Sequence, residues 1–233
     1  MREGKGMQKM WILVLFAETE SDLTTKLKSM APKALGRNVG DREQSKVELC
    51  TLRKYLSLKI VESVFEFPLT IFYGDRPDIK VEANGKVTGI EVTEAIWPRV
   101  AKGRQIAYEM DLNSFSLGEL ARINSIVEDK SGAIKTHFKG GNANVRPFIN
   151  YEPEEEMFVL LDQILTMKLN RLNAAGFELF PRNDLLIYEN SGLPCIQWKY
   201  VNVAGLRERN TKHAGKRFDQ IIIISDEELI YVM

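Results

Sequence analysis

The dipeptide Asn84-Gly85 separates two alternating runs of apolar and polar residues and predicts a β-hairpin. A two-residue loop needs positive φ at both of its residues, which Asn and Gly tolerate best. Counting outward from this loop places Ile79 opposite Ile90. One step further, Asp78 lies opposite Glu91 on a shared face, with Cβ atoms about 4.5–5.5 Å apart. Like charges repel there, and a divalent cation between them would turn the repulsion into attraction.

The predicted hairpin has two chemically different faces. The face expected to join the core is apolar and consists of Ile79, Val81, Ile90 and Val92. The opposite face carries Asp78, Lys80, Glu82, Val87, Gly89, Glu91 and Thr93. Gly89 has no side chain and is expected to leave space for a ligand or another backbone, while Lys80 is diagonal to Glu91 and within its reach. This face therefore offers two carboxylates, a lysine and a gap.

The segment from Pro77-Asp78 to Gly89-Ile90-Glu91-Val92-Thr93 resembles the active-site signature of the PD-(D/E)XK nuclease superfamily. More narrowly, it is similar to bacterial nuclease-like proteins that carry an RPDF…GIEVTEA pattern. The resemblance implies that Asp78 and Glu91 bind Mg²⁺, or Mn²⁺ in its place. It also implies a lysine two residues after the second acid that helps to activate the attacking water. Thr93 stands at that position, so catalysis requires a lysine from elsewhere.

Two lysines are candidates for the missing cation. Apolar residues at helical spacing predict a helix over 153–175, and Lys168 falls within its apolar stripe. A lysine there must either snorkel to water or meet an anion. The resemblance places this helix beside the catalytic sheet, so Lys168 can supply the cation. Lys80 is the rival because it needs no tertiary contact, and an exposed sheet lysine is its alternative interpretation.

The resemblance further implies a glutamate on the first core helix, which the apolar spacing predicts over 47–65. Glu48 and Glu62 both qualify, and Glu48, near the start of the helix, fits the layout better. A solvated helix carboxylate is the alternative for each. Asp75 is a further acid that lies just ahead of the signature.

Basic residues gather in three segments that could contact phosphates. The densest is the predicted loop 207–217, whose basic side chains include Arg207, Arg209, Lys212, Lys216 and Arg217. The other two groups are Arg99, Lys102 and Arg104, and then Lys135, His137, Lys139 and Arg146. Loops this basic would bind phosphates with a steep salt dependence, although solvated surface loops explain them equally well.

Composition limits the remaining classes of protein. The chain has 233 residues, of which 44% are hydrophobic and 27% charged, as in a folded globular domain. Lys+Arg and Asp+Glu both number 32, so a nucleic-acid surface must come from local segregation of charge. Cys50 and Cys195 have no metal or disulfide spacing, which favours reduced thiols and a cytoplasmic location. The apolar run 10–17 is shorter than the roughly 20 residues of a membrane span and predicts a buried strand or helix rather than a signal peptide.

The order of predicted elements indicates an α/β fold in which helices flank a mixed β-sheet. The resemblance to the PD-(D/E)XK nucleases implies that this is a restriction-endonuclease-like core. Besides the hairpin and the two helices above, we predict helices over 23–34 and 116–127, and strands over 69–73, 184–189, 195–203 and 218–224. The run Ile221–Ile224 predicts a central strand that is buried on both faces. Residues 1–44 are predicted to form an N-terminal extension, and 45–233 a nuclease-like domain with a partly helical insertion at about 97–151.

Together these patterns predict a metal-dependent nuclease that hydrolyses phosphodiester bonds, with DNA as the expected substrate. Asp78 and Glu91 would hold the metal with Glu48, and Lys168 or Lys80 would orient water or stabilise developing charge. A catalytically degenerate nuclease fold that acts as a nucleic-acid-binding or protein-interaction module is the alternative, as is an unrelated α/β protein. No membrane partner is expected, and a homodimer is left open.

Overall fold

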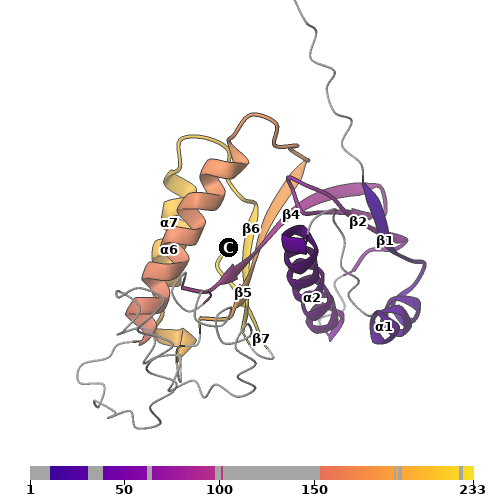
Figure 1. Ribbon diagram of the computed structural model, residues 1–233, viewed down its shortest axis with the longest axis horizontal. Coiled ribbons are helices and arrows are strands. Elements are labelled where there is room, and N and C mark those ends of the chain that lie inside the picture. Colours follow the sequence, from indigo (N-terminus) through magenta and orange to yellow (C-terminus); the bar gives the residue numbers. More distant parts are fainter. Residues whose placement is uncertain are drawn as a thin grey trace, which may run out of the picture.

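A computed structural model gives the structure of the chain and describes residues 11–30, 39–61, 65–97, 101, 153–191, 193, 196–225 and 228–233. Within these residues the protein belongs to the α/β class. A seven-stranded mixed sheet runs in the order β1-β2-β3-β4-β5-β6-β7, and helices pack on both of its faces (Figure 1).

The sheet combines antiparallel and parallel pairings. Its strands are β1 (Ile12–Ala17), β2 (Leu69–Tyr73), β3 (Ile79–Ala83), β4 (Lys86–Ala95), β5 (Arg182–Glu189), β6 (Gln220–Ser225) and β7 (Glu228–Tyr231). The helices are α1 (Glu20–Ser29), α2 (Val39–Val61), α6 (Pro153–Leu172), the 3-10 helix η1 (Trp198–Tyr200) and α7 (Val203–Lys212). The pairs β4–β5 and β5–β6 are parallel, and the other neighbours are antiparallel. Parallel neighbours need crossover connections, which contain α6 and α7.

The predicted hairpin register is confirmed. Ile79 pairs with Ile90, and Asn84 and Gly85 have φ values of 45° and 77°, as a two-residue loop requires. Strand β3 begins at Ile79, whereas β4 continues to Ala95 and pairs there with β5 alone. The second half of β4 therefore has a backbone edge that β3 does not cover.

Because successive side chains of a strand point to opposite faces of the sheet, they pack into two hydrophobic cores, one on each face. On one face, Val92 and Leu186 pack with Leu52 of α2. On the other, Leu185 packs with Leu161 of α6. Figure 1 shows α1 and α2 on one side of the sheet and α6 and α7 on the other. Strand β6 is buried on both faces as predicted, but it neighbours the terminal strand β7 rather than lying at the centre.

The part of the predicted N-terminal extension that the structure describes belongs to the fold. Strand β1 pairs with β2, and Leu23 of α1 is fully buried in the core with α2. The described part of the apolar run thus supplies the edge strand β1, in which Leu15 and Ala17 are buried whereas Leu13 and Phe16 are exposed. Among the described residues, no helix is long and apolar enough to cross a membrane.

Two predictions near the C-terminus are wrong. The predicted strand 195–203 is replaced in its described part by η1 and the start of α7, and much of the predicted loop 207–217 is the helix α7. The physical reason is a helix cap, because the Asn202 side chain accepts a hydrogen bond from the Gly205 amide at 3.0 Å. The predicted helix 116–127 and almost all of the predicted insertion lie outside the described residues.

Candidate active site

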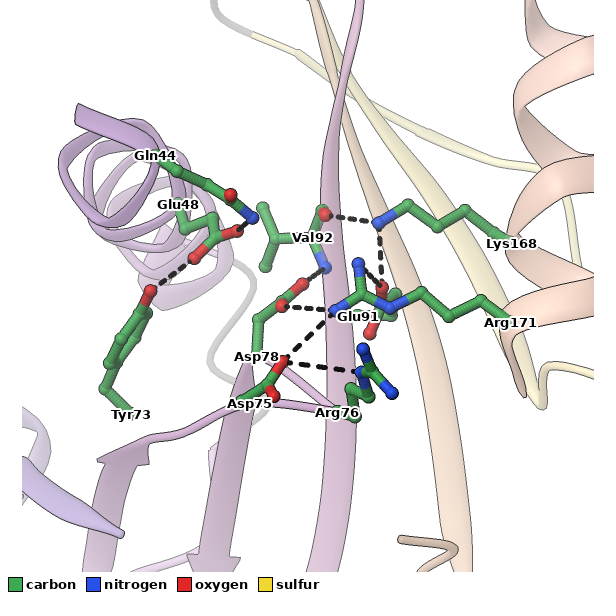
Figure 2. A network of polar contacts seen from close by, with 10 residues as sticks. All are labelled: Gln44, Glu48, Tyr73, Asp75, Arg76, Asp78, Glu91, Val92, Lys168 and Arg171. Carbon is green, nitrogen blue, oxygen red and sulfur yellow. Dashed lines mark hydrogen bonds and ion pairs between the residues drawn. The ribbon is translucent and has the colours of Figure 1, made fainter. Parts of the chain in front are cut away.

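The uncovered edge of β4 is where the acidic residues meet. The N–H and C=O groups of Val92 need partners there because β3 has not yet begun. Asp78 Oδ2 accepts a hydrogen bond from Val92 N at 2.8 Å, and the Val92 carbonyl accepts one from Lys168 Nζ at 2.9 Å. The Asp78 side chain thus takes the place of a strand partner, and Asp78 is only 3% exposed. Figure 2 shows Asp78 below Val92 and Lys168 reaching in from α6.

Glu91 is the most deeply buried acid of the site, with 1% of its surface exposed. Its Oε1 atom lies 2.8 Å from Lys168 Nζ and 3.1 Å from Nη1 of Arg171. Its Oε2 atom is buried and has no hydrogen-bond partner among the described residues. A buried polar atom without a partner is uncommon in folded proteins and is an available ligand position.

Lys168 therefore reaches the acids, as the apolar stripe of its helix led us to predict. Arg171 follows it by one helical turn and lies on the same side of α6, with Nη2 3.5 Å from Asp78 Oδ1. Our sequence analysis missed Arg171. Its position three residues after Lys168 was the available signal, since residues at that spacing share a helix face.

Glu48 enters the site from α2, on the other side of β4. Its carboxylate is buried and accepts hydrogen bonds of 2.7 Å from Gln44 Nε2 and from the Tyr73 hydroxyl. Burial raises the pKa of Glu48, while these two bonds and the Lys168 ammonium oppose the increase. The pKa of the Tyr73 hydroxyl is also raised, by burial and by the Glu48 carboxylate, so Tyr73 remains a donor. Glu62, the alternative to Glu48, lies outside the described residues.

Burial and neighbouring carboxylates raise the proton affinity of Asp78 and Glu48. Burial, followed by the charges of Glu91 and Glu48, raises the pKa of Asp78 from 3.8 to about 8. The Lys168 ammonium and the Val92 amide oppose this increase only partly. At Asp78 the nearby positive charge therefore does not offset burial and the two neighbouring carboxylates.

The structure does not bring Lys80 to the carboxylates. Its ammonium lies 2.9 Å from Glu82 Oε1 and within 4.2 Å of the ring centroid of Phe72, its cross-strand partner in β2. The gap expected at Gly89 is also filled. A Cβ atom there would lie 2.7 Å from the Phe180 ring and 2.9 Å from Pro77, so Gly89 accommodates protein side chains rather than a ligand.

The basic residues of 207–217, which were predicted to contact phosphates, do not converge on the acids either. Arg207 donates to the Val232 carbonyl at 2.7 Å, and Arg209 pairs with Asp162 of α6. Asp162 precedes Arg171 by nine residues, which places it about 180° away around the helix. Of the remaining members of this basic group, Lys212 pairs with Glu208, and Arg217 donates to the Thr211 carbonyl at 2.6 Å. The last member is Lys216. The other two basic groups lie outside the described residues.

The acids have the chemistry of a Mg²⁺ site without forming a complete one. Their oxygen ligands are of the kind that Mg²⁺ takes, and Glu91 Oε2 has no other partner. No cluster of three or more His, Cys, Asp or Glu side chains in the described part of the chain is arranged to hold a metal ion. Mg²⁺ usually retains several waters and needs few protein carboxylates, so a site with two carboxylates is compatible with this ion.

Fold and site together define an α/β protein with a buried acidic pair, which two cations contact beside the part of β4 that β3 leaves uncovered. In comparison with known proteins, no family model, curated protein or solved structure matches the chain.

Proposed function

We propose that the protein is a metal-dependent nuclease with a restriction-endonuclease-like fold that hydrolyses phosphodiester bonds, with DNA as its expected substrate. The observation that carries this proposal is the buried pair Asp78 and Glu91, with Lys168 held against Glu91 at 2.8 Å. Burying two carboxylates side by side destabilises a fold, so the pair requires a cation.

The order of elements around the pair supports the same proposal. Helix α2, with Glu48, precedes the strands β2, β3 and β4, and helix α6, with Lys168, follows them. The resemblance to the PD-(D/E)XK nucleases implies both a glutamate on the first core helix and a helix packed beside the catalytic sheet. The buried position of Glu48 and the contact of Lys168 with Glu91, both far from the signature in sequence, support the proposal.

Each residue has a distinct role in the proposed reaction. Asp78 and Glu91 would hold Mg²⁺ or Mn²⁺, while Glu48 adds negative charge from the α2 side. When bound, the metal supplies a water of lowered pKa and neutralises charge on the scissile phosphate. Lys168 is held by Glu91 and by the Val92 carbonyl, so its ammonium is fixed where it can orient the attacking water and stabilise developing charge. Lys168 thereby replaces the lysine that is absent at Thr93.

A cleavage assay with matched lysine variants tests this proposal. Single- and double-stranded DNA and RNA are incubated with wild type, Asp78→Ala, Glu91→Ala, Lys168→Ala and Lys80→Ala in Mg²⁺ or Mn²⁺. We expect the two acid variants to be inactive and Lys168→Ala to lose about 10²–10³-fold in rate, as for removal of one charge-stabilising donor. Lys80→Ala is the control, because its ammonium contacts Glu82 instead. If wild type cuts no substrate with either metal, the nuclease proposal fails.

A catalytically degenerate nuclease fold that binds nucleic acid is the second candidate. It is favoured by Thr93 at the lysine position and by Lys168 and Arg171, which neutralise Glu91 without a metal. Calorimetric titration with Mn²⁺ separates the two functions. Binding that disappears in Asp78→Ala, together with cleavage by wild type, excludes the degenerate protein, whereas nucleic-acid binding without metal affinity or cleavage supports it.

A further inference from the structure

Arg171 bridges the two acids that the proposed metal requires. Its Nη2 atom lies 3.5 Å from Asp78 Oδ1, and its Nη1 atom lies 3.1 Å from Glu91 Oε1 (Figure 2). A divalent cation bound to these carboxylates would lie close to the Arg171 guanidinium, which is also positively charged. Repulsion between the two is strong in a poorly screened environment. Arg171 and the metal therefore compete for the same oxygens.

Arg171 is also placed so that its guanidinium can move away from Asp78 and Glu91. Its side chain is 32% exposed, and Nη2 is 3.5 Å from Asp75 Oδ1 as well as from Asp78. Asp75 is 78% exposed, so it gives the guanidinium a second anionic partner on the solvent side of the acidic pair. Lys168 differs, because it is 13% exposed and its ammonium also bonds to the Val92 carbonyl inside the site. Of the two cations, Arg171 is the one that can turn outward.

We infer that a divalent metal displaces Arg171 from Asp78 and Glu91, and that the displaced guanidinium then binds the anionic oxygens of the substrate phosphodiester. This inference rests on the proposed function and assigns a substrate-binding residue to it. A guanidinium presents a planar fork of donors that matches phosphate oxygens bidentately, which a lysine cannot do. Metal-free protein thus keeps its acids neutralised, and metal binding makes Arg171 available to the phosphate.

Two readouts with opposite signs test the inference. Mn²⁺ affinity is measured by calorimetry without nucleic acid, and the KM for DNA cleavage is measured in Mn²⁺, for wild type, Arg171→Gln, Arg171→Lys and Arg209→Gln. We expect Arg171→Gln to bind Mn²⁺ about tenfold more tightly, because one charge-assisted competitor is lost, and to show a KM about tenfold higher. Arg171→Lys should keep the wild-type Mn²⁺ affinity and still raise the KM. Arg209→Gln, on the other side of α6, should change neither quantity.

The outcomes separate this inference from the function beneath it. If wild type binds Mn²⁺ and cuts DNA while Arg171→Gln binds Mn²⁺ no more tightly, or has an unchanged KM, the inference alone is wrong. A residue with only a structural role would weaken metal binding when replaced, which would also overturn it. If wild type neither binds Mn²⁺ nor cleaves, both the function and the inference fail.

Discussion

Replacing Asp78 with Asn should stabilise the metal-free protein, by an amount that depends on pH. Folding raises the pKa of this carboxyl from 3.8 to about 8, because the ionised form is buried beside Glu91 and Glu48. Between these two values the native state holds a proton that the unfolded state has released. The contribution of Asp78 to the free energy of unfolding is therefore greatest below about pH 4. It falls by about 1.4 kcal/mol per pH unit until about pH 8. Asn carries no charge and keeps an oxygen that can accept the Val92 amide hydrogen.

The expected size of the effect follows from that interval. At pH 7 keeping Asp78 protonated costs the native state about 4 kcal/mol relative to pH 4, and other coupled acids share part of that cost. We expect Asp78→Asn to be more stable than wild type by about 2–4 kcal/mol near pH 8 and to match it near pH 4. Mn²⁺ should reverse the order, because it binds the native wild type and not the variant.

Urea unfolding in EDTA at pH 4, 6 and 8, followed by far-UV circular dichroism, measures this difference. Asp75→Asn is the matched control, since Asp75 is an exposed acid three residues earlier. If the stability of Asp78→Asn relative to wild type does not increase from pH 4 to pH 8 without metal, the reasoning from burial is refuted.

Three further predictions test other parts of the structure. The Mn²⁺ affinity of wild type should increase by up to about tenfold per pH unit below pH 8, because metal binding must release the Asp78 proton. Calorimetry in buffers of different ionisation enthalpy would detect the released proton. Tyr73→Phe removes the hydroxyl that donates to Glu48 and should destabilise the fold by about 1–3 kcal/mol in urea unfolding, whereas Tyr200→Phe, at an exposed position, should have no effect. Leu165→Ala, in the core between α6 and the sheet, should cost about 2–5 kcal/mol by the same measurement, and Met167→Ala on the exposed face of α6 far less.

The parts of the site that local physics determines were predictable from sequence. Asn84-Gly85 determines the loop, and the loop determines the register up to the pair Ile79 and Ile90. Asp78 and Glu91 come next in the chain, and Arg171 contacts both of them. The stripe of α6 was also informative, because a lysine among buried leucines must either snorkel to water or meet an anion. Lys168 therefore stood out before its contact with Glu91 was known.

The parts that depend on tertiary packing were not predictable in this way. Lys80 was placed correctly in register, but β2 brings Phe72 across from it, and the ring and Glu82 hold its ammonium away from Glu91. Arg171 shares a helix face with Lys168, yet only the position of α6 beside β4 shows that it reaches the same acids. Basic composition predicted a loop at 207–217, where the Asn202 cap begins a helix instead.

The position of Val92 at the end of the β3–β4 pairing has a consequence for how the site tolerates mutation. Both groups that Val92 contributes belong to its backbone, with the amide bound to Asp78 and the carbonyl to Lys168. Any residue that fits the core on the α2 side supplies the same two groups, so a scan of side chains would assign Val92 no part in function. Proline is the exception because it lacks the amide hydrogen. Two backbone contacts of the candidate site thus depend on a position whose amino-acid identity is expected to be nearly neutral.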